Sequence, residues 1–390
     1  MLVQAKIAWF DRDQAHLRNF RTAVSIHSHT SCSKESLEFV GRILDSHPVL
    51  RAWIRSHDGK ARNRGLPIDL NRAYWTPPVC PRSAYELEVN QIHQRLGKDA
   101  MVSLTDHDCI DANLLLRVVP ALRDLPISLE WTVPFQTSKF HLGVHNLPGA
   151  RAAEILEELK ACTAQPSTER VCDTLRMLHE IREVLIVFNH PLWNLYANPA
   201  AEFAQNLEDF LALNNGHLHA FELNGTRGWE ENRRVAHLTA KWQQLLISGG
   251  DRHSFEPNAN LNLTHAESFG EWVQEIRVER RSELLFMPQY NESRVARFYQ
   301  VFLDAIRDNP NHPDGAVRWD QRTFHPGRNG EVQPISTLWD HVPGFLQLIL
   351  DVARLAETTP MLNALRALVR ISGGEVSGDM TGTTRQEEGA

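Results

Sequence analysis

The chain has 390 residues, 42% of them apolar, and a formal net charge of -7 at pH 7. This length suits two or three domains, or one βα barrel with insertions. The acidic balance argues against broad electrostatic binding of nucleic acid, which needs clustered Lys and Arg. It leaves room for a small phosphorylated ligand and indicates no membrane partner. The oligomeric partner is left open.

Cysteine usage and the N-terminal segment bear on the compartment. The five cysteines are scattered, and no two have the C-x-x-C spacing. This pattern is typical of a reducing compartment. The first 20 residues carry charges throughout and lack an apolar signal-peptide region. No apolar run is long enough to span a bilayer. We therefore expect a cytoplasmic protein.

Short apolar segments alternate with amphipathic ones along the first two thirds of the chain. The predicted strands, in chain order, are 23–27, 101–105, 126–130, 139–143, 184–188, 219–223 and 245–248. The amphipathic stretches between them are 150–161, 169–182, 201–213 and 229–244. Short continuous apolar strands separated by helices predict βα units and an α/β fold with a parallel sheet.

Two regions depart from this alternation. Residues 38–97 form a long insertion after the first strand, with a helix expected around 84–96. The region from about 255 to 369 is expected to be mostly helical, with a break at 309–333, and 371–390 to be a disordered tail. We expect domain boundaries at 1–270 for the core, 271–370 for a helical extension packed on it, and 371–390 for the tail.

Polar side chains gather at the ends of the predicted strands. They are His27, His29, Asp106, His107, Asp108, Glu130, His141, His190, Glu222, Asn224, Asp251 and His253. In parallel α/β folds the active site forms at the carboxyl ends of the strands. Imidazole and carboxylate together suit zinc, manganese or iron. The sequence therefore predicts a metal site at this rim.

Spacing supports this interpretation. His27 and His29 are two residues apart, so on a strand both side chains point to one face and can reach one ion. Asp251 and His253 have the same spacing. Glu222 and Asp106 are interpreted as residues that orient ligands. The other histidines are expected to be ordinary core or surface residues, with His145 the least certain because it lies four residues after His141.

The ordered motifs resemble those of the PHP (polymerase and histidinol phosphatase) superfamily. The matching segments are His27-x-His29-Thr30, Thr105-Asp106-His107-Asp108, Glu130, His141, His190-Pro191 and Gly250-Asp251-x-His253. They span residues 23–253 in the family's order, although the insertion before the second motif is longer than usual.

This resemblance implies a distorted (β/α)7 barrel, with the long insertion after the first strand and a helical C-terminal extension. It implies two or three divalent ions (Zn, Mn or Fe) and hydrolysis of a phosphate ester by metal-activated hydroxide. By analogy, the first ion takes His27, His29, Glu130 and Asp251. The second takes Glu130, His141 and His190, and the third takes His107 and His253.

One position departs from the family pattern. The third ion normally takes an Asp or His shortly after the HxH pair, where this chain has Lys34. A protonated Lys has no lone pair for a metal. Either Glu35 takes over or the third ion is absent, with Lys34 gripping the phosphate instead. Lys34 and Arg252 are the predicted catalytic cations. Arg252 contributes only if the chain has already left the strand.

Two alternatives stay open. HxH with a late Asp also suits an amidohydrolase-like activity on a C–N or C–O bond, although no metal-bridging carboxylated Lys is evident. A non-catalytic, metal-stabilised interaction module is the second. The substrate, a phosphomonoester, a nucleotide-like compound or a diester, is not fixed by the sequence.

Overall fold

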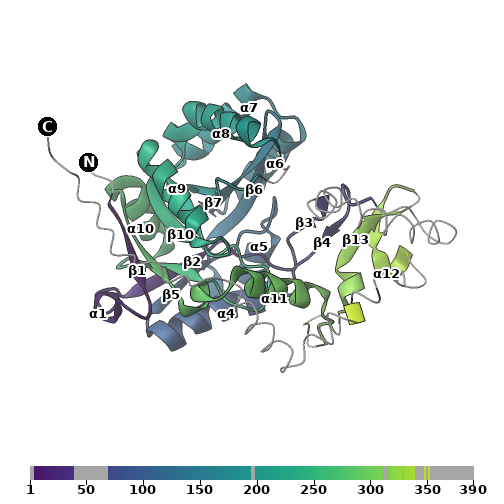
Figure 1. Ribbon diagram of the computed structural model, residues 1–390, viewed down its shortest axis with the longest axis horizontal. Helices are drawn as coiled ribbons and strands as arrows, with labels where there is room; N and C mark the ends of the chain where they lie inside the picture. Colours follow the sequence, from purple (N-terminus) through teal and green to yellow (C-terminus); the bar gives the residue numbers. More distant parts are fainter. Residues whose placement is uncertain are drawn as a thin grey trace.

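A computed structural model describes residues 4–38, 69–194, 198–310, 317–327 and 329–338, with single positions 312, 315, 347, 350 and 351. Most of the predicted insertion (39–68), most of 339–368 and the predicted tail lie outside these residues. The described chain is a mixed α/β structure with several sheets (Figure 1). The α/β expectation is confirmed.

The first five-stranded sheet has the order β1-β12-β11-β2-β5. Its strands are β1 (Gln4–Trp9), β2 (Thr22–Ile26), β5 (Asp99–Ser103), β11 (Asn260–Thr264) and β12 (Arg281–Phe286). β2 runs parallel to β5, and β1 parallel to β12, whereas β11 runs antiparallel to both of its neighbours. The all-parallel expectation is therefore wrong for this sheet.

The second five-stranded sheet has the order β10-β9-β8-β7-β6. Its strands are β6 (Ile127–Phe135), β7 (Ser138–Leu147), β8 (Leu185–Asn189), β9 (Ala220–Asn224) and β10 (Leu245–Gly249). β8, β9 and β10 are parallel, but β6 and β7 form an antiparallel hairpin. The tight turn, with Gln136 at φ 51°, leaves no room for the crossover helix that a parallel pair needs.

Both edge strands of the second sheet, β6 and β10, are joined to the first sheet. On one side, the N–H of Glu130 in β6 donates to Asp106 after β5 (3.2 Å), and the N–H of Asp108 donates to Glu130 (2.9 Å). On the other, the N–H of Gly250 after β10 donates to Ile26 in β2 (3.0 Å). Side chains also join them, since the amide of Asn262 bonds both the N–H and the C=O of Ser248 (2.9 Å each).

A buried core lies between the sheets. Val24 and Ile26 from the first sheet pack with Leu185, Val187 and Ile247 from the second, all with at most 1% exposure. β8 is buried on both faces, which explains its continuous run of apolar residues. Because the cores and hydrogen bonds are shared, the strand ends of both sheets converge on one region.

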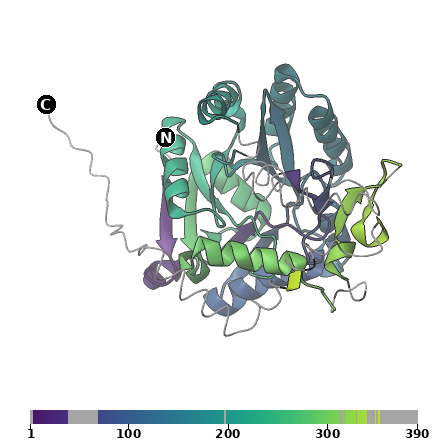
Figure 2. The ribbon, with the colours of Figure 1, turned by 45° about the vertical axis from the view of Figure 1, so that its right-hand side comes forward.

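Helices cover the outer faces. They include α4 (Pro81–Gln91), α5 (Asp111–Arg117), α6 (Ala152–Ala164), α7 (Thr168–Glu180), α8 (Ala200–Asn214), α9 (Trp229–Lys241), α10 (Phe269–Gln274) and α11 (Arg294–Ile306), with the short α1 (Gln14–Leu17) and α12 (Ile335–Leu338). Figure 2 shows α6 to α9 around the second sheet. The predicted amphipathic stretches correspond to α6–α9, and α4 with its π-helical end at Ile92–Leu96 corresponds to the helix expected in the insertion.

A small third sheet, β14-β13-β4-β3, lies beside the two large ones (Figure 1). It joins β3 (Glu35–Ser36) and β4 (Tyr74–Trp75) to β13 (Thr323–Pro326) and β14 (Val332–Pro334). The mostly helical expectation after residue 255 is wrong for β11 and β12, which lie in the first sheet, and for β13 and β14. The division into domains stays a prediction.

Candidate metal centre

The predicted ligands follow strands that stop abruptly. His27 comes directly after β2, His190 after β8 and Asp251 soon after β10. All three have positive φ angles, at 63°, 28° and 55°. This backbone region is unfavourable for residues other than glycine, and such strain concentrates at functional sites. The turns aim the three side chains inward across the carboxyl ends of the strands.

One bridge aligns the two ligand pairs. Ser28 and Arg252 form an isolated parallel β-bridge. In both bridged segments, the residues on either side of the bridge therefore point to the opposite face. The N–H of His29 donates to Arg252 (2.8 Å) and that of Asp251 to His27 (2.7 Å). The predicted strand alternation of HxH therefore holds, although it comes from this bridge and not from β2, which ends at Ile26.

Glu130 lies at the centre of the ring of histidines. Its Oε2 is 3.2 Å from Nε2 of both His27 and His29. Its Oε1 is 3.1 Å from Nε2 of His190 and 3.5 Å from Nδ1 of His141. Oε2 is also 3.5 Å from Nε2 of His107, so the two oxygens face different sets of imidazoles. A carboxylate so placed can bridge two cations.

Four overlapping groups could each hold an ion. Their members are His27, His29 and Glu130; His27, His190 and Asp251; His107, Glu130 and His141; and His29, Glu35, His107 and His253. The structure thus brings together all eight ligands that the sequence analysis singled out, and it adds Glu35. The groupings differ in detail from the family analogy, because His190 lies with Asp251 and His141 with His107.

Glu35 completes the fourth group. Its Oε2 is 3.1 Å from Nε2 of His253 and 3.4 Å from Nε2 of His107. The hydroxyl of Ser33 donates to Glu35 Oε1 (2.5 Å) and lies 3.3 Å from Nδ1 of His29. Of the two alternatives left open at this position, the geometry favours Glu35 as the residue that takes the place of the family's Asp or His.

Unpaired buried atoms fit bound cations. Within the described residues, Nε2 of His29 and Oε2 of Glu130 have no hydrogen-bond partner, although both are buried. Burying such groups without a partner is costly. A divalent ion between them would satisfy both lone pairs, and the mixed nitrogen and oxygen donor set suits zinc, manganese or iron.

The electrostatics point the same way. Burial opposes charge on His27, yet Glu130, Glu222 and Asp251 hold its pKa well above its ordinary value. Burial likewise opposes charge on His107, but Glu35 and Glu130 raise its pKa to about 10. The histidines in turn hold the pKa of each of Glu35, Glu130 and Asp251 well below its ordinary value. The carboxylates therefore stay ionised and attract cations.

Further polar residues orient the ligands. Glu222 Oε1 lies 2.5 Å from Nδ1 of His27, and its Oε2 accepts the N–H of His190 (2.9 Å). A ligand histidine commonly donates its second N–H to a carboxylate in this way. Gly249 permits the approach, since a Cβ there would lie 1.8 Å from Glu222 Oε1. The predicted orienting role of Glu222 matches this geometry.

Asp106 has a similar supporting place. It accepts the backbone N–H of Thr30 (2.6 Å) and the Thr30 hydroxyl (2.8 Å). Asp106 lies outside the four ligand groups. It therefore fixes the turn that follows the HxH pair.

Arg252 does not face the cluster, which corrects its prediction as a catalytic cation. Its Nε donates to Glu88 Oε1 of α4 (2.9 Å), and its Nη1 donates to the carbonyl of Ser254 (2.9 Å). The Ser28–Arg252 bridge turns its side chain away from the neighbouring ligands. Ser25 also donates to Glu88 (2.8 Å). This buried network anchors the Asp251–His253 segment to α4.

Lys34 is the second correction. It comes directly before Glu35, the first residue of β3. Its side chain is exposed, and its Nζ lies over the Tyr74 ring, 5.4 Å from the centroid. Lys34 lies outside the ligand groups. It is therefore not the cation that faces the cluster.

Arg227, which the sequence analysis missed, is a cation at the cluster. Its Nη2 is 3.7 Å from Asp251 Oδ2, and its guanidinium lies over the Trp193 ring, 3.5 Å from the centroid. The side chain is 12% exposed, and its Nε has no hydrogen-bond partner among the described residues. A single Arg after a strand carries too weak a sequence signal to be found without the fold.

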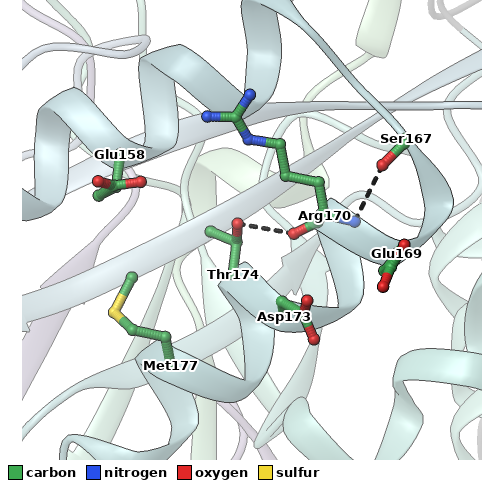
Figure 3. A pocket seen from close by; sticks show the side chains of 7 residues that line it. All are labelled: Glu158, Ser167, Glu169, Arg170, Asp173, Thr174 and Met177. Atoms are coloured by element: carbon green, nitrogen blue, oxygen red, sulfur yellow. Dashed lines mark hydrogen bonds between the residues drawn. The ribbon is translucent and has the colours of Figure 1, made fainter.

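Other candidate positions lie away from the cluster. His145 is fully buried and bonds the Ser103 hydroxyl (2.8 Å), and burial lowers its pKa to about 3. A surface pocket between α6 and α7 is shown in Figure 3. There, the hydroxyl of Ser167 accepts the backbone N–H of Arg170, and the hydroxyl of Thr174 donates to the backbone carbonyl of Arg170. The pocket holds none of the predicted ligands.

Comparisons with known proteins give distant likenesses only. No protein-family model and no curated protein matches the chain. An amidohydrolase from Chromobacterium violaceum, solved with bound sulfate and no metal, is 13% identical, covering 59% of this chain and 87% of its own (TM-score 0.33). A protein from Bifidobacterium adolescentis, described as a candidate metal-dependent phosphoesterase, is 14% identical, covering 67% and 96% (TM-score 0.33). PsfC from Pseudomonas syringae PB-5123 is 15% identical, covering 53% and 84% (TM-score 0.37).

Among the described residues, no helix combines the length and apolar character needed to cross a membrane.

Proposed function

We propose that this chain is a metal-dependent phosphoesterase of the PHP type, which hydrolyses a phosphate ester. The observation that carries the proposal is the position of Glu130, whose two oxygens face separate sets of histidines 3.1–3.5 Å away. Adjacent cations suit hydrolysis of phosphate esters, because they supply Lewis-acid charge neutralisation and an activated water.

The distorted barrel is part of the same proposal. Ten strands lie in the two large sheets, and hydrogen bonds join both edges of the second sheet to the first. The ordered motifs from HxH to the late DxH resemble those of PHP proteins. Their side chains converge at one rim, as such a barrel requires.

The chain's own residues would hold two or three ions. His27, His29, Glu130, His141, His190 and Asp251 would hold two of them. His29, Glu35, His107 and His253 would hold the third. Glu222 and Asp106 keep the ligands oriented, and Arg252 with Glu88 keeps the DxH loop in place.

Arg227 supplies the positive charge that the sequence analysis assigned to Lys34 and Arg252. Its Nε–H has no hydrogen-bond partner among the described residues, and its guanidinium lies beside Asp251. Both features suit binding of a phosphoryl oxygen. In the reaction, the bond from phosphorus to the leaving oxygen breaks, the oxygen of a water bonds to phosphorus, and the leaving oxygen takes up a proton. Arg227 stabilises the charge on the phosphoryl oxygens during this exchange.

The test is turnover with defined metals. Protein loaded with manganese or zinc is incubated with phosphomonoesters, phosphodiesters and nucleotides, beside His27→Ala and Asp251→Asn. We expect both variants to lose nearly all turnover, and Arg227→Ala to lose about 10- to 100-fold in kcat/KM, as for the loss of one charged hydrogen-bond donor. Equal turnover by wild type, His27→Ala and Asp251→Asn would refute the assignment. Hydrolysis of amides in place of esters would favour the amidohydrolase alternative.

A further inference from the structure

The small third sheet delivers two side chains to the metal centre. In its register, Glu35 of β3 lies directly opposite Trp75 of β4. Residues directly opposite in an antiparallel pair share a face, with Cβ atoms about 5 Å apart. Glu35 points into the fourth ligand group, so Trp75 stands on the same side. The next pair of the register, Ser36 and Tyr74, lies on the opposite face.

Trp75 lies at the edge of the cluster. Its ring centroid is 6.2 Å from that of His253, with the planes inclined by 36°. The side chain is half-buried, so part of the indole stays accessible beside the ligands. The neighbouring Tyr74, by contrast, is stacked on Phe324 at 4.7 Å and 13°. The Tyr74–Phe324 stack lies on the face of β4 that points away from the cluster, whereas Trp75 points toward the cluster.

A different tryptophan flanks the opposite end of the centre. Trp193 lies beside His190, with ring centroids 6.2 Å apart, and its face is covered by Arg227 at 3.5 Å. The two tryptophans therefore differ in whether a cation covers the ring face. Trp193 is occupied by the cation that suits the phosphoryl group, whereas no cation is stacked on Trp75 among the described residues.

We propose that Trp75 is a specificity-determining residue, and that the substrate is a phosphate ester with a planar aromatic leaving group that lies against its indole. This inference rests on the proposed function. The phosphoryl group lies at Glu130 and Arg227, and the ring attached through the ester oxygen extends past His253 to Trp75. Aromatic rings stack on indole by dispersion and quadrupole contacts that an alkyl group does not make.

The test compares aryl with alkyl ligands. Binding of phenylphosphonate and ethylphosphonate, which are not hydrolysed, is measured by calorimetry on manganese-loaded wild type, Trp75→Phe and Trp75→Leu. We expect wild type to prefer the phenyl compound about tenfold, as one stacked ring provides. Trp75→Phe keeps most of this preference, and Trp75→Leu abolishes it. The kcat/KM ratio for phenyl phosphate over ethyl phosphate changes in the same order.

Two controls separate stacking from damage to the fold. Metal content per chain shows whether Trp75→Leu retains Glu35 in place, and Trp242→Leu, at the end of α9, tests a tryptophan far from the cluster. An unchanged phenyl preference in Trp75→Leu overturns the inference, and so does an equal loss for both ligands. Because binding needs no turnover, an intact preference without hydrolysis of any ester would refute the proposed function alone.

Discussion

Two histidine clusters lie at opposite ends of the second sheet, and only one resembles a metal site. At the carboxyl end, the imidazoles surround Glu35, Glu130 and Asp251. At the amino end, His179, His217 and His219 gather with ring centroids 5.1 and 5.5 Å apart. The rings are similarly close in both places but, among the described residues, carboxylates surround the rings only in the first cluster, at the carboxyl end.

In the amino-end cluster, both ring nitrogens of His219 already contact other groups, whereas Nδ1 of His217 has no hydrogen-bond partner among the described residues. Nδ1 of His219 accepts the N–H of Ile186 (2.8 Å), and its Nε2 lies 3.0 Å from Nδ1 of His179. Arg277 and Arg280 donate to the carbonyls of His179 and His219. Burial and these arginines hold the pKa of His219 well below its ordinary value.

The difference teaches that a group of histidines is not by itself a metal site. A site needs carboxylates that offset the charge of the ion, and ring nitrogens that no hydrogen bond has used. His217 and His219 have the same HxH spacing as His27 and His29. They belong to the histidines that were expected to be ordinary core or surface residues, and both lie before β9, at the amino end of the sheet.

The largest effect should come from removing the central carboxylate. Glu130→Gln keeps the shape of the side chain but loses the charge that faces five of the candidate ligand histidines. We expect loss of bound metal and a fall of about 10³-fold in kcat/KM, or about 4 kcal/mol of transition-state stabilisation. Elemental analysis and steady-state kinetics provide the measurement. A variant with full metal content would show that the histidines alone suffice.

A smaller effect should follow at the fourth ligand group. Glu35→Gln should remove one ion per chain and lower turnover about 10- to 100-fold, a common effect of disturbing a metal's ligand shell. Lys34→Ala, at the neighbouring exposed residue, is the matched control, and it should leave both values within about twofold. If Lys34→Ala is the more damaging change, the assignment of this position to Glu35 is wrong.

The smallest effect should appear at the amino end, in stability rather than activity. Because the folded-state pKa of His219 lies below its ordinary value of 6.5, the unfolded state binds more protons as pH falls. The contribution of His219 to stability is thus full above about pH 6.5 and declines as the pH falls below it. Urea unfolding from pH 5 to 7.5 measures the slope.

His219→Gln should flatten this slope and leave metal content and kcat/KM unchanged. An identical pH dependence in the variant would show that the amino-end cluster does not control acid sensitivity. A loss of metal would mean instead that the two clusters are coupled.

Sequence periodicity predicted the strands that are apolar throughout. The run from Val184 to Phe188 is an example, since β8 covers Leu185–Asn189. The hairpin of β6 and β7 was missed because its two predicted strands looked like separate βα units. Nothing in a single chain fixes strand direction when the connecting segment contains few turn residues.

β11 was missed for a different reason. Its sequence alternates Asn260 and Asn262 with Leu261 and Leu263, which resembles a half-exposed segment, yet all four are buried. The asparagine amides bond to backbone groups of the second sheet, at Leu223 and Ser248. Polarity in a sequence does not imply exposure when an amide replaces a backbone partner.

Within the site, motif order predicted the ligands that resemble a known family. Arg227 and Trp75 were not predicted, because each comes from a loop or strand whose neighbours are set by tertiary contacts. Glu35 was only one of two alternatives. Burial, which short motifs do not reveal, decides between them, because Glu35 is buried among the histidines and Lys34 is exposed.

The placement of Glu35 has a thermodynamic consequence for the distant part of the chain. β3 pairs with β4, and β4 pairs with β13, so residues 323–326 share a sheet with a candidate ligand. An ion held by Glu35 would favour this strand pairing. Because coupling free energies are reciprocal, any contact that stabilises the position of β13 would raise the affinity for that ion by the same factor. Ion binding and pairing of the C-terminal strands would then be one coupled equilibrium. Measuring either ion binding or strand pairing would report on both.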